Sequence, residues 1–249
     1  MKNFIKKIIR KFYSIVFRAN KLNNSKEILE FTEDQYYEEM FTRNKDWNTV
    51  DPNHEEILRW NKIKSIIEKL DINSFIEINI LDLGCGRGWL TNLLNQYGSA
   101  QGIEPVSSVV EYGKSLYPHL KLTSGNASEF LEREPQTKFQ LIVSSEVIEH
   151  IPFENKNEFA QQISLLLKTN GYLIITTPRA EAQQLYLQHA GADQPIEDWM
   201  MEEDVKRVFT LNGFAVVSID RINCFIPNSS VLTDLYQVWC FRKLESNDL

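Results

Sequence analysis

Short apolar runs alternate with longer amphipathic stretches along residues 78–241. The runs have the length of buried strands, whereas the stretches between them carry apolar residues at the spacing of one helix face. This alternation predicts strands and helices in turn, as in a parallel sheet with helical crossovers. Strands are predicted at 78–83, 100–104, 120–123, 139–144, 172–177, 214–220 and 236–241, and helices at 88–97, 105–117, 126–133, 155–168 and 201–212. The last two runs leave no room for a helix and predict a hairpin.

The chain before residue 76 has a helical pattern. Within residues 1–26, apolar side chains fall on one side of a helical wheel and Lys and Arg fall opposite. Such a basic amphipathic helix either contacts an anionic membrane surface through residues 1–20 or packs on the body as a cap. Residues 27–75 predict an N-terminal helical lid, in which the turn at 51–53 starts a helix that runs to about Leu70.

Charge changes this picture, because the basic residues are concentrated at one end. The 249 residues hold 27 Lys and Arg against 34 Asp and Glu, a net charge of −7, but residues 1–26 hold eight basic residues and no acidic one. The remainder therefore carries −15, which disfavours a nucleic acid as partner. Three cysteines without a paired C-x-x-C spacing predict a reduced, cytoplasmic chain with neither a disulfide framework nor a zinc site.

A glycine-rich loop follows the first predicted strand, in the sequence Leu81-Asp82-Leu83-Gly84-Cys85-Gly86-Arg87-Gly88. Glycines at the carboxyl end of a strand let the backbone turn tightly and approach a ligand closely. The position at which a dinucleotide fingerprint needs its third glycine holds Trp89, which disfavours NAD. Glu104 ends the second predicted strand, where a carboxylate accepts hydrogen bonds from ribose hydroxyls.

Three further motifs follow in order. They are Gly102-Ile103-Glu104-Pro105, the sequence FQLIVSSEVIEHI at 139–151 and the sequence NGYLIITTP at 170–178. With these motifs the chain resembles the class I S-adenosylmethionine-dependent methyltransferases of the small-molecule type, such as the ubiquinone-pathway O-methyltransferases. The resemblance implies a Rossmann-like α/β fold, with a seven-stranded sheet whose last strand is antiparallel and with helices on both faces. It also implies a methyltransferase core over residues 76–249 that binds S-adenosylmethionine and has an acceptor-pocket insert at about 179–200.

The resemblance implies a cofactor site as well. Asp82 would take the amino group of the cofactor, Glu104 would bind its ribose, and Pro105 would lie against its adenine. The remaining residues carried over are Gly84, Gly86 and Gly88 along the methionine moiety, Asn126 at the adenine amino group, and Ser145 beside the reactive methyl group.

His150 is the predicted catalytic residue. The pKa of an unperturbed imidazole, about 6.5, suits removal of a proton from a hydroxyl near neutral pH. The similar enzymes place such a Glu-His pair beside the acceptor; alternatively, His150 only fills its loop. Tyr36, Tyr37 and Trp199 are predicted to line the acceptor pocket, since such pockets are mostly apolar with a few polar groups.

The predicted function is transfer of a methyl group from S-adenosylmethionine to an oxygen, less readily a nitrogen, of a small-molecule acceptor. One alternative is metal-assisted RNA 2′-O-methylation, because Glu146, Glu149 and His150 match the ligand set of such enzymes. A missing downstream histidine and the acidic body disfavour it, so no metal is predicted. The other alternative is a non-catalytic binding protein, which the intact glycines disfavour. The sequence leaves the acceptor and the oligomeric state open.

Overall fold

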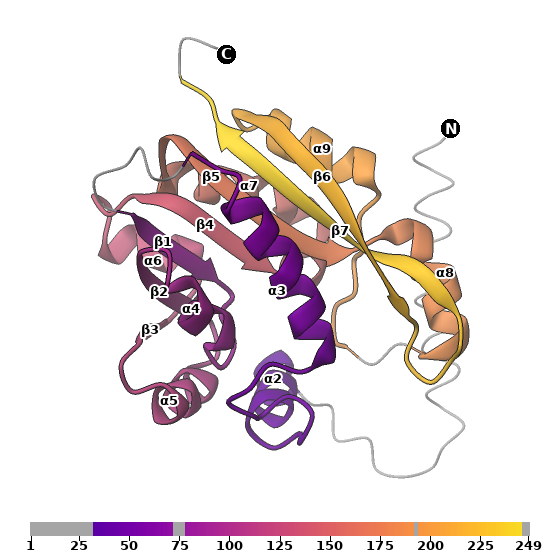
Figure 1. Cartoon of the computed structure of the whole chain (residues 1–249). Helices are drawn as coiled ribbons and strands as arrows, with labels where there is room; N and C mark the ends of the chain where they lie inside the picture. The colour runs from indigo at the N-terminus through magenta and orange to yellow at the C-terminus, as the bar shows by residue number, and fades with distance from the viewer. Residues whose placement is uncertain (1–31, 72–77, 192–193, 246–249) are drawn as a thin grey trace. The chain divides into compact units, whose positions relative to one another are not determined.

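Seven strands form one sheet in the computed structural model of the chain, which describes residues 32–71, 78–191 and 194–245 (Figure 1). Their order is β3-β2-β1-β4-β5-β7-β6. β7 runs antiparallel to β5 and β6, whereas the pairs from β3 to β5 are parallel. The predicted sheet with an antiparallel last strand is therefore confirmed. The strands are β1 (Asn79–Leu83), β2 (Ser99–Glu104), β3 (Lys121–Ser124), β4 (Phe139–Ser145), β5 (Leu167–Pro178), β6 (Phe214–Phe225) and β7 (Leu232–Lys243).

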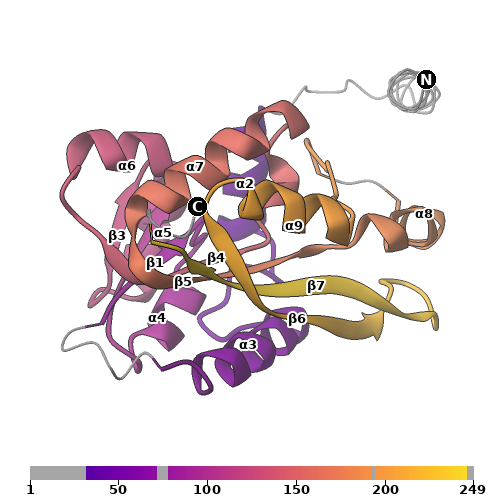
Figure 2. The same ribbon diagram turned by 90° about the horizontal axis from the view of Figure 1, so that it is seen from above.

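Helices cover both faces of this sheet, as predicted (Figure 2). Successive side chains of a strand point to opposite faces, so Ile80 packs with the helices of one face and Leu81 with those of the other. One face carries α3 (His54–Ile67), α4 (Trp89–Leu94) and α5 (Ser107–Leu116), and the other carries α6 (Ala127–Arg133), α7 (Lys156–Leu166) and α9 (Glu202–Thr210).

α3 begins where the sequence predicts. The side chain of Asn53 accepts a hydrogen bond from Glu56 N at 2.9 Å, and Glu56 Oε2 accepts one from Asn53 N at 2.8 Å. This capping box satisfies two backbone donors that a helix start otherwise leaves without partners. α3 also buries Trp60 and Ile63 in the main core, so this part of the predicted lid belongs to the helical layer over the sheet. α2 (Glu33–Thr42) buries no residue fully and packs against α5.

The end of the chain departs from the predicted elements. The insert at about 179–200 contains α8 (Ala180–His189), of which only Ala182 is buried, so the apolar stripe that would predict a helix is missing. β5, β6 and β7 are each 12 residues long and exceed the predicted runs. The β6–β7 pairing extends to Phe225 opposite Leu232, and both of those side chains are exposed, so no buried pattern marks this part of the hairpin.

The chain divides into two compact units, Met1–Thr32 and Glu33–Leu249, and the fold above is that of the second. The predicted basic helix within residues 1–26, with its membrane contact through residues 1–20, lies outside the described residues. Within the described ranges, none of the helices has both the length and the apolar character that crossing a membrane requires. Two short 3₁₀ turns, η2 (Ile148–His150) and η3 (Phe153–Asn155), connect β4 to α7.

Candidate functional site

The glycine loop after β1 turns through left-handed backbone conformations. Gly84, Gly86 and Gly88 have φ values of 78°, 50° and 91°, which side chains other than glycine rarely adopt. Their surroundings differ. A Cβ on Gly84 would collide with Val147, and one on Gly88 would lie 3.0 Å from Leu122, so packing alone requires these two glycines.

Gly86 faces a different neighbour. A Cβ on Gly86 would lie 3.2 Å from the ring of Phe41, which comes from α2. The side chain of Phe41 therefore covers the middle of the glycine loop. Of the three glycines, Gly86 is the one that lies against α2. Phe41 was not among the residues predicted for the site, because a partly buried aromatic on a helix carries no signal for what it covers.

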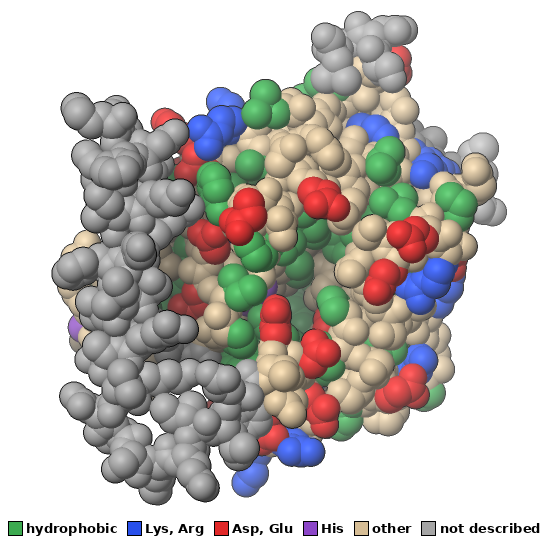
Figure 3. Space-filling model, turned by 180° about the vertical axis from the view of Figure 1, so that it is seen from behind, with side chains coloured by type: hydrophobic (Ala, Val, Ile, Leu, Met, Phe, Trp, Pro, Cys, Tyr) green, Lys and Arg blue, Asp and Glu red, His purple; other side chains and the backbone are tan. Residues whose placement is uncertain are grey.

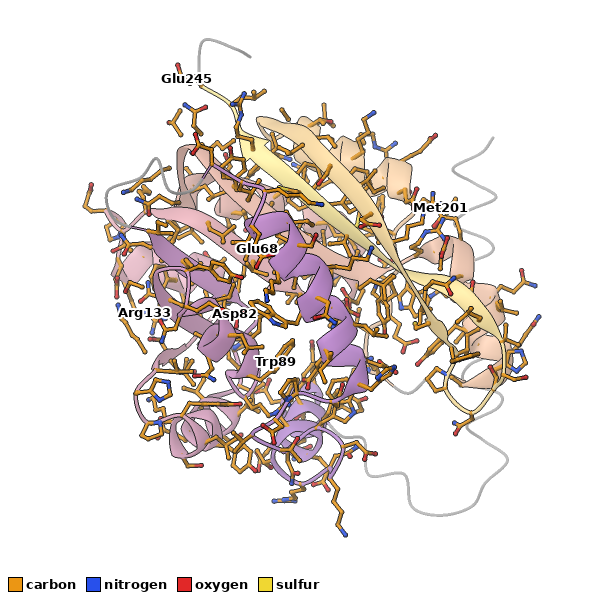
Figure 4. All side chains as sticks on the ribbon, in the orientation of Figure 1. Glu68, Asp82, Trp89, Arg133, Met201 and Glu245 are labelled. Carbon is orange, nitrogen blue, oxygen red and sulfur yellow. The ribbon has the colours of Figure 1, made fainter. Side chains whose placement is uncertain are left out.

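Two buried carboxylates stand at the ends of neighbouring strands. Asp82 belongs to β1 and points into the interior of the protein (Figure 4), where its Oδ2 accepts a hydrogen bond from Thr91 Oγ1 at 2.6 Å. Glu104 accepts from the backbone N of Gly86 and of Val106, each at 3.1 Å. Burial raises the pKa of both carboxyls to about 7.

Neither carboxylate forms an ion pair with a Lys or Arg of the described residues. Buried charges in proteins are normally paired or hydrogen-bonded on every side. Asp82 and Glu104 are therefore suited to a ligand that brings a cation and hydroxyl donors of its own.

Three further residues predicted for the cofactor lie around the same edge of the sheet. Pro105 is exposed directly after Glu104. Asn126 caps α6, because its Oδ1 accepts from Glu129 N at 3.0 Å, so one acceptor position of the amide is already used. Ser145 Oγ shares a hydrogen bond of 2.8 Å with Thr176 Oγ1.

The loop after β4 presents His150 in a defined orientation. Nδ1 of His150 lies 2.9 Å from the carbonyl oxygen of Ile196. Because a carbonyl only accepts, Nδ1 carries the proton and Nε2 of the neutral ring keeps a free lone pair. Nε2 lies 3.7 Å from Oε1 of Glu149. Burial lowers the pKa of the imidazole, so the ring is neutral at neutral pH.

The carboxylates of this loop are both held by threonines of β5. Thr176 Oγ1 donates to Glu146 and Thr177 Oγ1 donates to Glu149, each at 2.9 Å. Burial raises the pKa of both carboxyls, and the charge of Glu149 raises that of Glu146 further. Glu146 also has a φ of 58°, and strained backbone of this kind is concentrated at functional sites.

α2 brings aromatic side chains to His150. The ring of Tyr37 meets the imidazole edge-on with centroids 5.6 Å apart, and it contacts Tyr36 at 5.3 Å. The hydroxyl oxygen of Tyr37 is buried without a hydrogen-bond partner. Trp199 instead packs on Tyr186 of α8, with centroids 5.1 Å apart. The structure thus places Tyr37 against His150, with Tyr36 packed on Tyr37, whereas Trp199 lies against α8.

Arg59 of α3 is a buried cation that the sequence did not single out. Its guanidinium lies 5.5 Å from the ring centroid of Tyr236 and 3.9 Å from Glu55, and its Nε has no hydrogen-bond partner. Burial alone would lower the pKa of Arg59, but nearby carboxylates, Glu146 first among them, raise it above its ordinary value. A charged position on an amphipathic helix normally faces solvent, so no pattern predicts this placement.

One face of the described surface is hollowed, and acidic side chains lie around the hollow (Figure 3). Within the described ranges, no three His, Cys, Asp or Glu side chains are grouped so as to hold a metal ion. Glu146 and Glu149 accept hydrogen bonds from two adjacent threonines of β5, Thr176 and Thr177, whereas His150 donates to the Ile196 carbonyl. The geometry therefore gives the metal-assisted alternative no support.

The sequence of residues 55–219 matches a protein family described as a methyltransferase domain. The chain belongs to this family. The human mitochondrial ubiquinone biosynthesis O-methyltransferase is 33% identical over 128 residues, 48% of this chain and 34% of that protein. The phosphoethanolamine N-methyltransferase of Plasmodium falciparum is 31% identical over 116 residues, 45% of this chain and 43% of that protein. The matching regions thus span less than half the length of these relatives.

A solved structure of magnesium protoporphyrin IX methyltransferase from Synechocystis PCC 6803, with bound S-adenosylmethionine, has the same fold. Its TM-score is 0.59 at 14% identity, over 89% of this chain and 100% of that one. The residues of the present chain fit the S-adenosylmethionine that this structure holds. The cofactor carries an ammonium group and ribose hydroxyls, which supply the cation and the donors that Asp82 and Glu104 lack.

Proposed function

We propose that this protein transfers a methyl group from S-adenosylmethionine to a hydroxyl oxygen of a small molecule, with His150 as general base. The hydrogen bond from Nδ1 of His150 to Ile196 carries the proposal, because it leaves Nε2 as the basic atom of a neutral ring. A depressed pKa keeps the ring in this basic form at neutral pH.

When bound, S-adenosylmethionine supplies an electrophilic methyl group, so the protein must mainly hold the acceptor in line with it at about 3–3.5 Å. Nε2 of His150 takes the hydroxyl proton as the oxygen becomes the nucleophile. Glu149, at 3.7 Å from Nε2, then stabilises the imidazolium. Tyr37 beside the imidazole and the net negative charge of residues 27–249 fit an acceptor that is partly apolar and not strongly anionic. An RNA backbone is disfavoured for the same reason.

We assign the predicted cofactor residues accordingly. Asp82 takes the ammonium group, Glu104 takes the ribose hydroxyls, and Gly86 lets the methionine moiety approach the loop beneath Phe41. Pro105 lies at the adenine. Asn126 contributes only those hydrogen-bonding positions of its amide that the cap of α6 does not use.

Oxygen is favoured over nitrogen because an alcohol or phenol needs a base in place before it attacks. The relatives include both kinds of enzyme, one named as an O-methyltransferase and one as an N-methyltransferase. The test is a transfer assay with labelled S-adenosylmethionine across matched hydroxyl and amine acceptors, with the site of methylation read by mass spectrometry. Products methylated at nitrogen alone would overturn the choice of oxygen.

The variant His150→Ala tests the role of the general base without altering the cofactor site. Turnover should fall by roughly 10²–10⁴, the usual contribution of a general base, while affinity for S-adenosylhomocysteine stays unchanged in calorimetry. His189→Ala is the matched control, because His189 is exposed at the end of α8. Unchanged turnover in His150→Ala removes His150 from this role.

A further inference from the structure

Lys156, the first residue of α7, is fully buried. Its Nζ donates hydrogen bonds to the carbonyl oxygen of Ile148 at 2.7 Å and to that of Asp198 at 2.5 Å. Burying an ammonium group is costly unless strong hydrogen bonds compensate it. A leucine or methionine would fill the same space at lower cost, so the position needs a cationic donor.

The two carbonyls belong to segments far apart in the sequence. Ile148 starts the 3₁₀ turn that ends in His150. Asp198 belongs to residues 194–200, which we name the strap, and its backbone N donates to Glu149 O at 2.8 Å. The strap also supplies the Ile196 carbonyl that accepts the Nδ1 proton of His150. Lys156 therefore ties together the loop that carries the imidazole and the segment that orients it.

We propose that Lys156 is a positioning residue for His150: its buried ammonium fixes the strap against the 148–150 turn, so that the Ile196 carbonyl selects the tautomer with Nε2 free. The inference rests on the proposed role of His150. Lys156 touches neither acceptor nor cofactor in this scheme and acts only through the imidazole.

The same ammonium acts on the imidazole electrostatically. Glu146 and Glu149 face the ring from its own loop and Glu33 and Tyr37 from α2, while Lys156 faces it from α7. The carboxylates of Glu146 and Glu33 favour the protonated ring, whereas the charge of Lys156 opposes it. Removing that charge alone should raise the pKa of His150. Losing the hydrogen bond to Ile196 as well should lower it, because that hydrogen bond favours the protonated ring more than the charge of Lys156 opposes it. A lysine with no influence on the strap would move neither the tautomer nor the pKa in a variant that stays folded.

The test is the imidazole nitrogen NMR spectrum of the full chain, which reports tautomer and pKa without acceptor or cofactor. The chain has four histidines, and His150→Gln identifies the signal. In the wild type we expect the proton on Nδ1 and a pKa below the ordinary value. In Lys156→Met we expect a mixture of tautomers and a pKa below that of the wild type, because the lost hydrogen bond to Ile196 outweighs the lost charge. Lys156→Arg keeps the charge and a donor and should restore the wild-type tautomer and pKa.

Activity adds a second readout. In Lys156→Met, kcat should fall and the acidic limb of its pH profile should move to lower pH, with affinity for S-adenosylhomocysteine unchanged. A folded Lys156→Met with the wild-type tautomer and pKa overturns the inference. If Lys156→Met does not fold, Lys156→Gln keeps a donor without the charge, and an unshifted pKa there overturns it equally. Failure of the proposed base is distinct, because it appears as unchanged turnover in His150→Ala.

Discussion

Arg87 and Glu56 form a buried two-pronged ion pair, with Nη1 to Oε1 at 2.6 Å and Nη2 to Oε2 at 2.8 Å. Arg87 stands between two glycines of the glycine loop, and Glu56 lies in the first turn of α3. Nε of Arg87 also donates to the carbonyl of Thr49 at 2.6 Å. The glycine loop and the segment that leads into α3 are therefore held as one unit.

Breaking this pair should destabilise the protein strongly. Arg87→Met leaves the carboxylate of Glu56 buried without its partner, so the free energy of unfolding should fall by roughly 3–5 kcal/mol in urea denaturation. Adding Glu56→Gln, which keeps an acceptor for the Asn53 cap, should recover part of the loss. Arg43→Met is the control, because Arg43 pairs with Glu39 at the surface and should cost no more than about 1 kcal/mol. Equal losses in Arg43→Met and Arg87→Met would contradict this account.

Gly86→Arg should abolish binding of S-adenosylhomocysteine in calorimetry. The side chain would start 3.2 Å from the ring of Phe41 and fill the space that the methionine moiety needs. Gly191→Arg is a matched control, because Gly191 also has a left-handed φ, 75°, but has no atom within 4 Å of the Cβ position. Both variants share the backbone strain, so only the occupied space differs. Wild-type affinity in Gly86→Arg would place the cofactor elsewhere.

Affinity for S-adenosylhomocysteine should depend on pH through Asp82 and Glu104. Both carboxyls have a pKa of about 7 in the free protein, and both must be ionised to bind the ammonium group and the ribose. Below pH 7 they are protonated, so binding must release protons and the Kd should rise by up to about tenfold per pH unit for each group. Calorimetry between pH 5.5 and 8 measures this slope. Asp82→Asn should flatten it; an equally steep slope in that variant would exclude Asp82.

Much of the fold follows from the sequence because strand burial leaves a direct pattern. β1 and β4 are buried along nearly their whole length and are largely apolar, with Asp82 and Gln140 as interruptions. The capping box of Asn53 and Glu56 marks the start of α3 for a similar reason, since the signal is local. α8 was missed because only one of its residues, Ala182, is buried and polar residues are spread among the apolar ones.

The candidate site could be predicted at positions where only one type of residue can do what the position requires. The glycine loop, Glu104 and His150 stand out because few other residues would serve at those positions. Arg87, Arg59 and Lys156 did not, because a charged residue in an amphipathic pattern is normally solvated. Their burial depends on partners distant in sequence, such as Glu56 for Arg87 and the Asp198 carbonyl for Lys156. No local pattern contains that information.

The free protein should lose stability as the pH rises. Asp82, Glu104, Glu146 and Glu149 all have a pKa raised by burial above the ordinary carboxyl value. Between the ordinary value and the raised one, the folded state binds more protons than the unfolded state, so stability falls with increasing pH. It is fully present below about pH 4, where both states are protonated, and for Asp82 and Glu104 it is lost as the pH rises through about 7.

Urea denaturation at pH 5 and pH 8 measures this loss. Glu146→Gln should reduce the difference between the two pH values, because the buried amide does not ionise and Thr176 can still donate to its oxygen. Glu134→Gln serves as control, since its carboxylate is partly exposed on the surface, and it should leave the difference as in the wild type. Saturating S-adenosylhomocysteine should stabilise the protein more at pH 8 than at pH 5, because it binds the ionised forms of Asp82 and Glu104. If the free protein is more stable at pH 8 than at pH 5, the prediction is wrong. The ionised carboxylates would then be stabilised by positive charges other than that of the cofactor.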